Sequence, residues 1–240
     1  MRATVKVLAR RAEVFPEGQL VVHEEFRGLR KPIASLSLQR FNYDGDPSDL
    51  PTWQALSGTD GTFADTYCPD GNALAMMSIG ILPELHKQGL ANRLIDAALV
   101  LACELDVEHL MGSYRPSQLG AYMVENVDGS PEFYIQARRA DGLPLDPWLR
   151  ALTRKGMELI RYDAEAMKIE VPLRQFNEYR LTPGMRSRVR HLATSDAGEI
   201  WLCGATGHFE INDRSVVYRE ANVWGKIGRL GFVSGGSAAT

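Results

Sequence analysis

Residues 86–92, HKQGLAN, combine small and basic side chains in the manner of an anion-binding turn. Gly89 and Ala91 stand where bulky side chains would keep a ligand away from the backbone. A helix that starts here has free N–H groups in its first turn, and its dipole adds partial positive charge at the same end. Lys87 and Arg93 add full charges. The turn therefore predicts a phosphate or pyrophosphate ligand.

A strand and an amphipathic helix must hold this turn. Residues 73–82 form an apolar run in which Ile79 and Ile81 alternate as in a strand, and Pro83 ends it because proline cannot donate a ladder hydrogen bond. From about Lys87 the apolar residues recur at helical spacing. A dinucleotide-binding fold is disfavoured, since GxGxxG is absent and no matching acidic residue follows a second strand.

The strand and turn together resemble the GNAT superfamily of acyl-CoA-dependent N-acyltransferases. Gly89 and Ala91 match the two small residues that end the family's signature, and Pro83 follows the strand as it often does there. Gln88 precedes the glycine, also as in the family, whereas His86 replaces its usual Arg or Gln. In the family, the backbone of this turn binds the pyrophosphate of coenzyme A.

The resemblance implies an acyl-CoA co-substrate, most simply acetyl-CoA, and no metal. Backbone groups of the central strand would bind the pantetheine amides, as an open strand edge does. The residues expected to bind the co-substrate are Ile79, Gly80, Ile81, His86, Lys87, Gln88, Gly89, Leu90, Ala91 and Asn92. The alternative interpretation is structural, because a strand and a helix can carry small residues at their turn only to pack closely.

The fold implied is α/β, a GNAT-type mixed central sheet flanked by helices, with a C-terminal β extension. We expect a GNAT-like acyl-CoA-binding domain with a shortened N-terminus over residues 1–181, and an extension over 182–240 packed on the core or on a partner subunit. The turns before the central strand also resemble the GNAT branch associated with carbon-nitrogen hydrolases. Residues 43–72, rich in Gly, Asp, Pro and Ser, predict a functional or mobile loop.

Periodicity and turn residues locate the other elements. Helices are expected over 130–142 and 146–156, the second with Asp146 at its N-cap. Residues 115–129 are expected to be irregular, and 234–240 to be disordered. The expected strands are 19–26, 32–41, 107–114, 157–164, 169–181, 199–205, 208–212 and 215–224, with 27–31 and Asn212-Asp213 as hairpin turns.

Acyl transfer to an amine needs a neutral amine, a hydrogen-bond donor to the carbonyl oxygen and a proton for the leaving thiolate. A backbone N–H of the central strand can be the donor. The tyrosine that commonly protonates the thiolate in the family aligns with Leu152, and Met157 takes the place of a nearby phenylalanine. The glutamate base of the family's central strand is also missing, since residues 76–78 are Met, Met and Ser.

Other residues are nominated for these two roles. Tyr114 or Tyr122 is the expected acid, because both follow the strand that faces the thioester. The expected base is His23, Glu24 or Asp70. For each nominee the alternative is a packed or hydrogen-bonded residue without a catalytic role.

The predicted function is transfer of an acyl group, most simply acetyl, from coenzyme A to an amine of a small molecule. One alternative is a non-catalytic module that binds acyl-CoA or another protein. A second is an enzyme that acts on the thioester of an acyl-carrier protein, for which Lys87, Arg93 and the stretch 186–190 offer basic docking residues.

Composition sets limits on partners and location. The chain of 240 residues has a net charge of -3 and 45% hydrophobic residues, which gives no reason to expect nucleic acid or a membrane as partner. Arg186, Arg188 and Arg190 form a local basic cluster that can equally be a solvated face. With no apolar run of about 20 residues and no secretory h-region, we expect a cytoplasmic protein, as a monomer or a homodimer.

Three cysteines are widely spaced along the chain. Their odd number and spacing favour reduced thiols over disulfides or a zinc site. Cys103 falls on the main helix and Cys203 in an apolar strand, so both are expected in the core, while Cys68 lies in the loop before the central strand.

Overall fold

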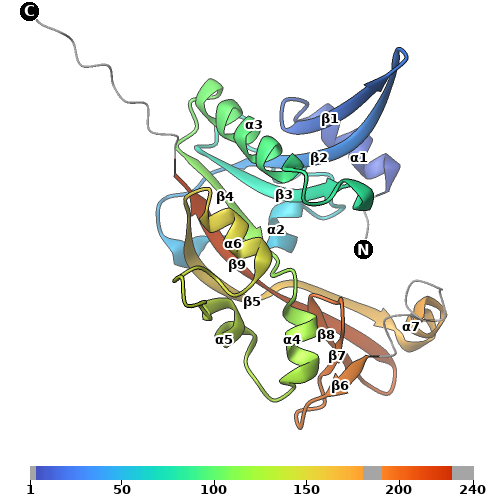
Figure 1. Ribbon diagram of the computed structural model, residues 1–240. Helices are drawn as coiled ribbons and strands as arrows, with labels where there is room; N and C mark the ends of the chain where they lie inside the picture. Colours follow the sequence, from blue (N-terminus) through green and yellow to red (C-terminus); the bar gives the residue numbers. More distant parts are fainter. Residues whose placement is uncertain (1–3, 181–190, 229–240) are drawn as a thin grey trace, which may run out of the picture.

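A mixed sheet of nine strands organises the computed structural model, which describes residues 4–180 and 191–228 (Figure 1). The strands lie in the order β1-β2-β3-β4-β9-β8-β7-β6, and β5 pairs with the other edge of β9. Their bounds are β1 Gln19–Phe26, β2 Leu29–Phe41, β3 Ala73–Ile81, β4 His109–Tyr114, β5 Met157–Pro172, β6 Leu192–Thr194, β7 Ile200–Leu202, β8 Gly207–Ile211 and β9 Ser215–Ile227. The helices are α1 Val5–Val14, α2 Trp53–Ser57, α3 Leu90–Glu104, α4 Leu119–Glu125, α5 Pro131–Gln136, α6 Pro147–Thr153 and α7 Leu173–Arg180, with short 3-10 turns η1 Pro47–Asp49 and η2 Pro83–Leu85.

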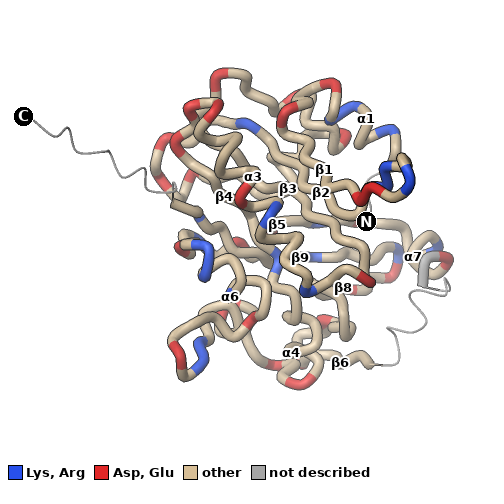
Figure 2. The backbone as a smooth tube through the Cα atoms, turned by 45° about the horizontal axis from the view of Figure 1, so that its top comes forward, with Lys and Arg blue, Asp and Glu red and all other residues tan. Residues whose placement is uncertain are grey.

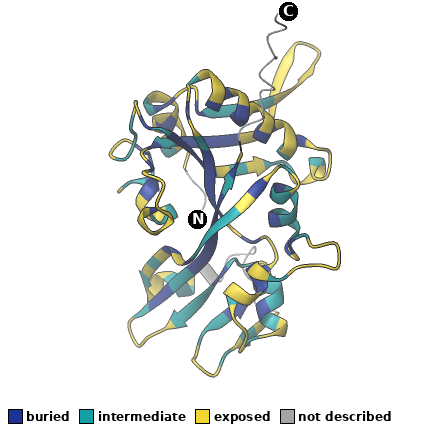
Figure 3. Ribbon diagram, turned by 90° about the vertical axis from the view of Figure 1, so that its left-hand side faces the viewer, coloured by how far each residue is buried: buried dark blue, intermediate teal, exposed yellow. Residues whose placement is uncertain are grey.

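The β1–β2 hairpin has a tighter turn than the sequence predicts. Arg27 and Gly28 alone join the strands, with φ angles of 50° and 77°. Two-residue hairpin loops of this kind need positive φ at both positions, which glycine adopts without steric cost. The second strand therefore starts at Leu29 instead of Pro32. The tip projects from the body with exposed side chains, Phe26 among them (yellow in Figure 3).

The central strand, turn and helix form where the sequence predicts them. β3 is buried from Ala73 to Met77 and has exposed residues beyond. Pro83 then opens η2, and α3 follows. Helical spacing turns one apolar face of α3 onto the sheet, and its buried residues are Leu90, Leu94, Ile95, Ala98, Leu99, Leu101 and Ala102.

Strands β3 and β4 run parallel but separate early. Their pairing ends at Ala75 opposite Met111, while β3 continues to Ile81 and β4 to Tyr114. The two strands diverge beyond this point (Figure 1). On its other edge β3 stays paired with β2, apart from a bulge that leaves Met77 without an opposite residue. The second half of β3 therefore has one edge that β4 does not cover.

The C-terminal strands complete this sheet. β9 pairs with β5 along one edge, and with β8 and then β4 along the other. β8 pairs with residues 216–220 of β9, and β4 pairs with residues 223–227. β8 and β4 therefore lie end to end along the same edge of β9. The predicted C-terminal β extension is therefore part of the central sheet. The predicted boundary after residue 181 falls among residues 181–190, outside the described residues.

The prediction of two strands over 157–181 is wrong. One strand, β5, continues through an irregular register after Asp163. Pro172 ends it because proline has no N–H for the ladder, and α7 begins at Leu173. The sequence LRQFNEYR is rich in residues of good helix propensity. The strand prediction extends through it because the residues just before it are typical of a strand.

The segment after β4 also differs from expectation. Residues 115–129 contain the helix α4, because Leu119 and Met123, four positions apart, are buried together with Trp201 of β7. The helix predicted over 130–142 ends at Gln136. Tertiary packing decides these bounds more than local propensity does.

Residues 43–72 cover the face of the sheet opposite α3. Leu56 and Phe63 are buried there with Trp224 of β9, in a core separate from the one beneath α3. The guanidinium of Arg11 in α1 lies 4.0 Å from the centre of the Phe63 ring. The loop expected to be functional or mobile is therefore a packed cover.

The three cysteines are free thiols in this structure. Cys68 and Cys203 are half-buried, but Cys103 is exposed, so its expected place in the core is wrong. The reason is helical geometry: Leu101 and Ala102 lie on the buried face of α3, and each further residue turns about 100° around the axis.

Charged residues of both signs are interspersed along the backbone (Figure 2). In the ranges 4–180 and 191–228, no helix has the length and apolar character to cross a membrane. The same residues include no group of three or more His, Cys, Asp or Glu placed to bind a metal ion. The basic cluster of Arg186, Arg188 and Arg190 and the tail 234–240 lie outside the described residues.

Candidate functional site

The turn between β3 and α3 has two residues in the left-handed region and open space in front of its backbone. Lys87 and Gly89 have φ angles of 64° and 78°, in the left-handed region. A Cβ atom built on Gly89 would meet no atom of the described residues within 4 Å. The backbone at Gly89 therefore faces open space, where a ligand can approach it closely.

The start of α3 supplies donors to this space. The first helical hydrogen bond runs from the N–H of Arg93 to the carbonyl of Gly89 at 3.1 Å. The N–H groups of Leu90, Ala91 and Asn92 precede that bond and have no acceptor within the helix. Lys87 is exposed beside them. Free N–H groups at a helix start are donors of the kind that an anion site needs, and anion binding at this turn stays a prediction.

Two of the expected ligand residues instead brace the turn. The ring Nε2 of His86 lies 3.2 Å from the carbonyl of Ile81, and the side-chain amide of Gln88 donates to the carbonyl of Glu84 at 3.4 Å. The His86 side chain thus contacts the end of β3, and the Gln88 side chain contacts η2. The backbone, rather than these side chains, is available for an anion.

The open edge of β3 leads to the turn. Ile79, Gly80 and Ile81 pair with β2 on one edge, and their other edge lies beyond the last pair with β4. The carbonyl of Met77 accepts a hydrogen bond from Trp53 Nε1 at 2.9 Å, which fixes the bulge. Residues 79–81 thus lie on an edge that β4 does not pair with, and the chain runs from them through η2 into the predicted turn.

Tyr114 lies at the point where β3 and β4 separate. A Cβ atom on Gly112 would come within 2.7 Å of its ring, and one on Gly225 within 3.1 Å, so these two glycines make room for the ring. The Cβ on Gly112 would also lie 3.2 Å from the carbonyl of Met76 in β3. The Tyr114 hydroxyl is buried without a hydrogen-bond partner among the described residues, and burial raises the pKa of this phenol.

The other nominated residues lie elsewhere. Tyr122, on α4, packs its ring 4.6 Å from that of Tyr134 and belongs to the cluster around Trp201. His23 and Glu24 are exposed on β1 of the projecting hairpin.

Asp70 is exposed, whereas Leu152 and Met157, which replace the family's tyrosine and phenylalanine, are buried. Asp70 precedes β3, at the end of that nine-residue strand remote from the turn, and is exposed. Leu152 is fully buried in α6, and Met157 is buried in β5. Both belong to the same core cluster as Tyr114. Of the nominated side chains, Tyr114 is therefore the one that adjoins the diverging strands.

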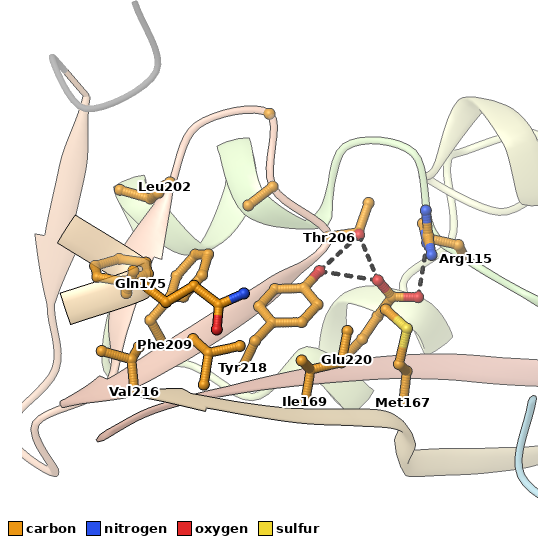
Figure 4. Close-up of a pocket in the computed structure, with 14 residues that line it drawn as sticks. Arg115, Met167, Ile169, Gln175, Leu202, Thr206, Phe209, Val216, Tyr218 and Glu220 are labelled. Atoms are coloured by element: carbon orange, nitrogen blue, oxygen red, sulfur yellow. Dashed lines mark hydrogen bonds and ion pairs between the residues drawn. The ribbon is translucent and has the colours of Figure 1, made fainter. Parts of the chain in front are cut away.

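Sequence reasoning missed a pocket of about 440 Å³ at the junction of β4 and β8 (Figure 4). Glu220, only 1% exposed, accepts hydrogen bonds there from Arg115 Nε at 2.7 Å, the Tyr218 hydroxyl at 2.8 Å and Thr206 Oγ1 at 2.9 Å. Burial and the neighbouring Glu220 carboxylate raise the pKa of Tyr218. One signal was visible in the sequence: Glu220 is an acidic residue within an otherwise largely apolar strand.

A second buried carboxylate faces an amide across β5 and β9. Asp163 pairs with Asn222, whose Nδ2 donates to Ser113 Oγ at 3.1 Å. Asp163 Oδ2 and Asn222 Oδ1 are both buried without a hydrogen-bond donor among the described residues. Burial raises the pKa of Asp163, an effect that Arg161 partly offsets.

We predict that Asp163→Asn stabilises the fold at neutral pH by about 1 kcal/mol, because it removes a buried charge whose Oδ2 accepts no hydrogen bond among the described residues. A raised pKa means that the folded state holds the Asp163 proton more tightly than the unfolded state does. Its contribution to stability therefore falls as pH rises from the unfolded pKa to the folded one. Urea unfolding between pH 4 and 7 should show a smaller loss of stability with rising pH in the variant. Exposed Asp213→Asn is the control, and equal slopes in both variants would contradict the prediction.

Comparisons with known proteins support the fold. The solved structure of GphF, described as a GNAT-like decarboxylase in complex with isobutyryl-CoA, superposes with a TM-score of 0.54 at 15% identity, covering 91% of this chain and 86% of that chain. The loading GNATL domain of CurA from Lyngbya majuscula gives a TM-score of 0.49 at 21% identity, covering 68% of this chain and 74% of that chain. No family model and no curated protein matches the sequence.

The fold is therefore of the GNAT type, as the resemblance implies. Its mixed sheet, flanked by helices and completed by C-terminal strands, agrees with the predicted fold class.

Proposed function

We propose that this chain binds an acyl-CoA thioester and transfers the acyl group, most simply acetyl, to an amine of a small molecule. The observation that carries the proposal is the continuity of the open β3 edge with the turn at Gly89. The free N–H groups that open α3 suit a pyrophosphate, and the edge of Ile79 to Ile81 suits pantetheine amides. The GNAT-type fold of GphF, described in complex with isobutyryl-CoA, supports this arrangement.

The reaction asks little covalent chemistry of the protein. A neutral amine attacks the thioester carbonyl, the C–N bond forms, the C–S bond breaks, and the amine nitrogen loses a proton to water. A backbone N–H of β3 near the bulge at Met77 stabilises the carbonyl oxygen as charge develops. Tyr114, which adjoins the diverging strands, protonates the leaving thiolate. The phenol is protonated at neutral pH, and because burial raises its pKa it is a weaker acid than an exposed tyrosine.

The test is turnover by the purified chain. We expect acetyl-CoA to bind in isothermal titration and free thiol to appear when a panel of primary amines is added, with the N-acetyl product identified by mass spectrometry. The rate should rise with pH until the amine is neutral. No heat of binding with either acetyl-CoA or free coenzyme A would overturn the proposal.

A second candidate is decarboxylation of a carboxyacyl thioester. The strand residues Met76, Met77 and Ser78 include no general base. This favours decarboxylation, because that reaction has no nucleophile for a base to activate. The C–C bond to the carboxylate breaks, carbon dioxide leaves, and the electron pair enters a thioester enolate that takes a proton at carbon. GphF is described as a decarboxylase of this fold. Conversion of malonyl-CoA to acetyl-CoA without an amine would identify this activity.

Exposed Lys87 and Arg93 leave a carrier-protein thioester as a further form of either substrate. Comparing the rates with acetyl-CoA and with an acetylated acyl-carrier protein distinguishes the two donors.

A further inference from the structure

The pocket at the β4–β8 junction has an apolar wall and one polar end. Strands β5, β7, β8 and β9 and the helix α7 contribute the wall, whose apolar side chains include Ile169, Phe176, Leu202, Phe209 and Val216. Three rings follow one another along it: the centroids of Phe176 and Phe209 are 5.5 Å apart, and those of Phe209 and Tyr218 are 5.0 Å apart. Such a wall suits an aromatic or aliphatic ligand body.

The carboxylate at the polar end is already satisfied. Glu220 accepts three hydrogen bonds, from Arg115, Thr206 and Tyr218 (Figure 4). The ion pair with Arg115 also neutralises its charge. A ligand amine would therefore gain little from Glu220, because it would compete with donors that are in place.

The guanidinium at the same end has unused donors. Arg115 bonds Glu220 through Nε, and its Nη1 and Nη2 have no hydrogen-bond partner among the described residues. Its side chain is 46% exposed and lines the pocket. Glu220 thus orients the planar guanidinium of Arg115, whose free N–H groups match the geometry of a carboxylate.

We propose that this pocket binds the acceptor, and that the acceptor is an apolar amino acid, with its carboxylate on Arg115 and its side chain against the aromatic wall. The acceptor role rests on the proposed function, whereas carboxylate binding does not. Arg115 lies four residues beyond Met111, the last residue of β4 paired with β3, which corresponds to about 13 Å along a strand. The pocket therefore starts within about 13 Å of the place where the two strands separate.

Three probes that share one ring test the ligand chemistry: 3-phenylpropionate, L-phenylalanine and phenethylamine. Isothermal titration should show that the two carboxylates bind and that phenethylamine binds at least about tenfold more weakly. Tight binding of phenethylamine, or no binding of 3-phenylpropionate, would overturn the carboxylate assignment. This comparison uses the unmodified chain and does not depend on the folding of any variant.

Two variants locate the site. Arg115→Lys keeps a positive charge beside buried Glu220 but removes the planar guanidinium, so we expect at least about tenfold weaker binding of 3-phenylpropionate with little loss of fold. Exposed Arg154→Lys is the matched control and should bind as the parent does. Unchanged affinity in Arg115→Lys would show that the carboxylate does not bind there.

The acceptor role has its own readout. With acetyl-CoA present, phenylalanine should give N-acetylphenylalanine and free thiol, and Arg115→Lys should raise the KM for phenylalanine more than it lowers kcat. If other amines are acetylated and phenylalanine is not, the acceptor assignment fails while the proposed function stands. If acetyl-CoA itself does not bind, the proposed function fails. The titrations with 3-phenylpropionate still show whether the pocket binds a carboxylate.

Discussion

Binding of acetyl-CoA is expected to fall at least about 100-fold when Gly89 is replaced by tryptophan. A side chain at this position enters open space rather than the protein, since a Cβ there meets nothing within 4 Å. The indole would therefore occupy the volume in front of the free N–H groups of α3, where the pyrophosphate is proposed to bind. Isothermal titration with acetyl-CoA and with free coenzyme A measures the loss.

Gly142→Trp is the matched control for this experiment. Gly142 also has a positive φ, of 76°, and no atom within 4 Å of a built Cβ, but it lies in the turn between α5 and α6. Both variants carry the strain of a non-glycine residue in the left-handed region, roughly 1–2 kcal/mol. Equal affinities of the two variants for acetyl-CoA would show that the turn at Gly89 is not part of the binding site.

The second large effect is expected at the phenol nearest the diverging strands. Tyr114→Phe should lower kcat at least about 100-fold if the hydroxyl protonates the thiolate. The same change should raise the free energy of unfolding by about 1 kcal/mol, because it removes a buried hydroxyl that has no hydrogen-bond partner among the described residues. Single-turnover kinetics and urea unfolding measure the two effects separately.

Tyr122→Phe is the companion variant, since Tyr122 was nominated for the same role but packs against Tyr134. We expect its kcat to stay within about threefold of the parent value, far less than the effect of losing a general acid. A stabilised Tyr114→Phe with undiminished kcat would leave Tyr114 as a core residue only. A large loss in Tyr122→Phe instead would move the acid to α4.

Features set by adjacent residues could be predicted from the sequence. The end of β3 at Pro83, the small residues of the turn and the capping of α6 by Asp146 each depend on a few neighbouring positions. Asp146 accepts hydrogen bonds from the N–H groups of Trp148 and Leu149, as its position before a proline predicts. These signals act within one or two turns of the chain, so no tertiary knowledge was needed.

Features set by distant residues could not be predicted in this way. Arg115 and Glu220 are 105 positions apart, and only the end-to-end placement of β4 and β8 along β9 brings them together. The helix α4 likewise depends on Trp201, which lies far along the chain. Asp70, one of the expected bases, is close to β3 in the sequence but lies at the end of that strand remote from the turn.

The position of β9 has a consequence for synthesis of the chain. β4 and β5 are made long before the residues of β9, yet each needs β9 as a partner. While the chain emerges from the ribosome, both strands keep unpaired edges, which are sites of aggregation in other proteins. The sheet closes only after residue 227 has been added. A fragment that ends before β9 therefore lacks the strand that joins β4 to β5.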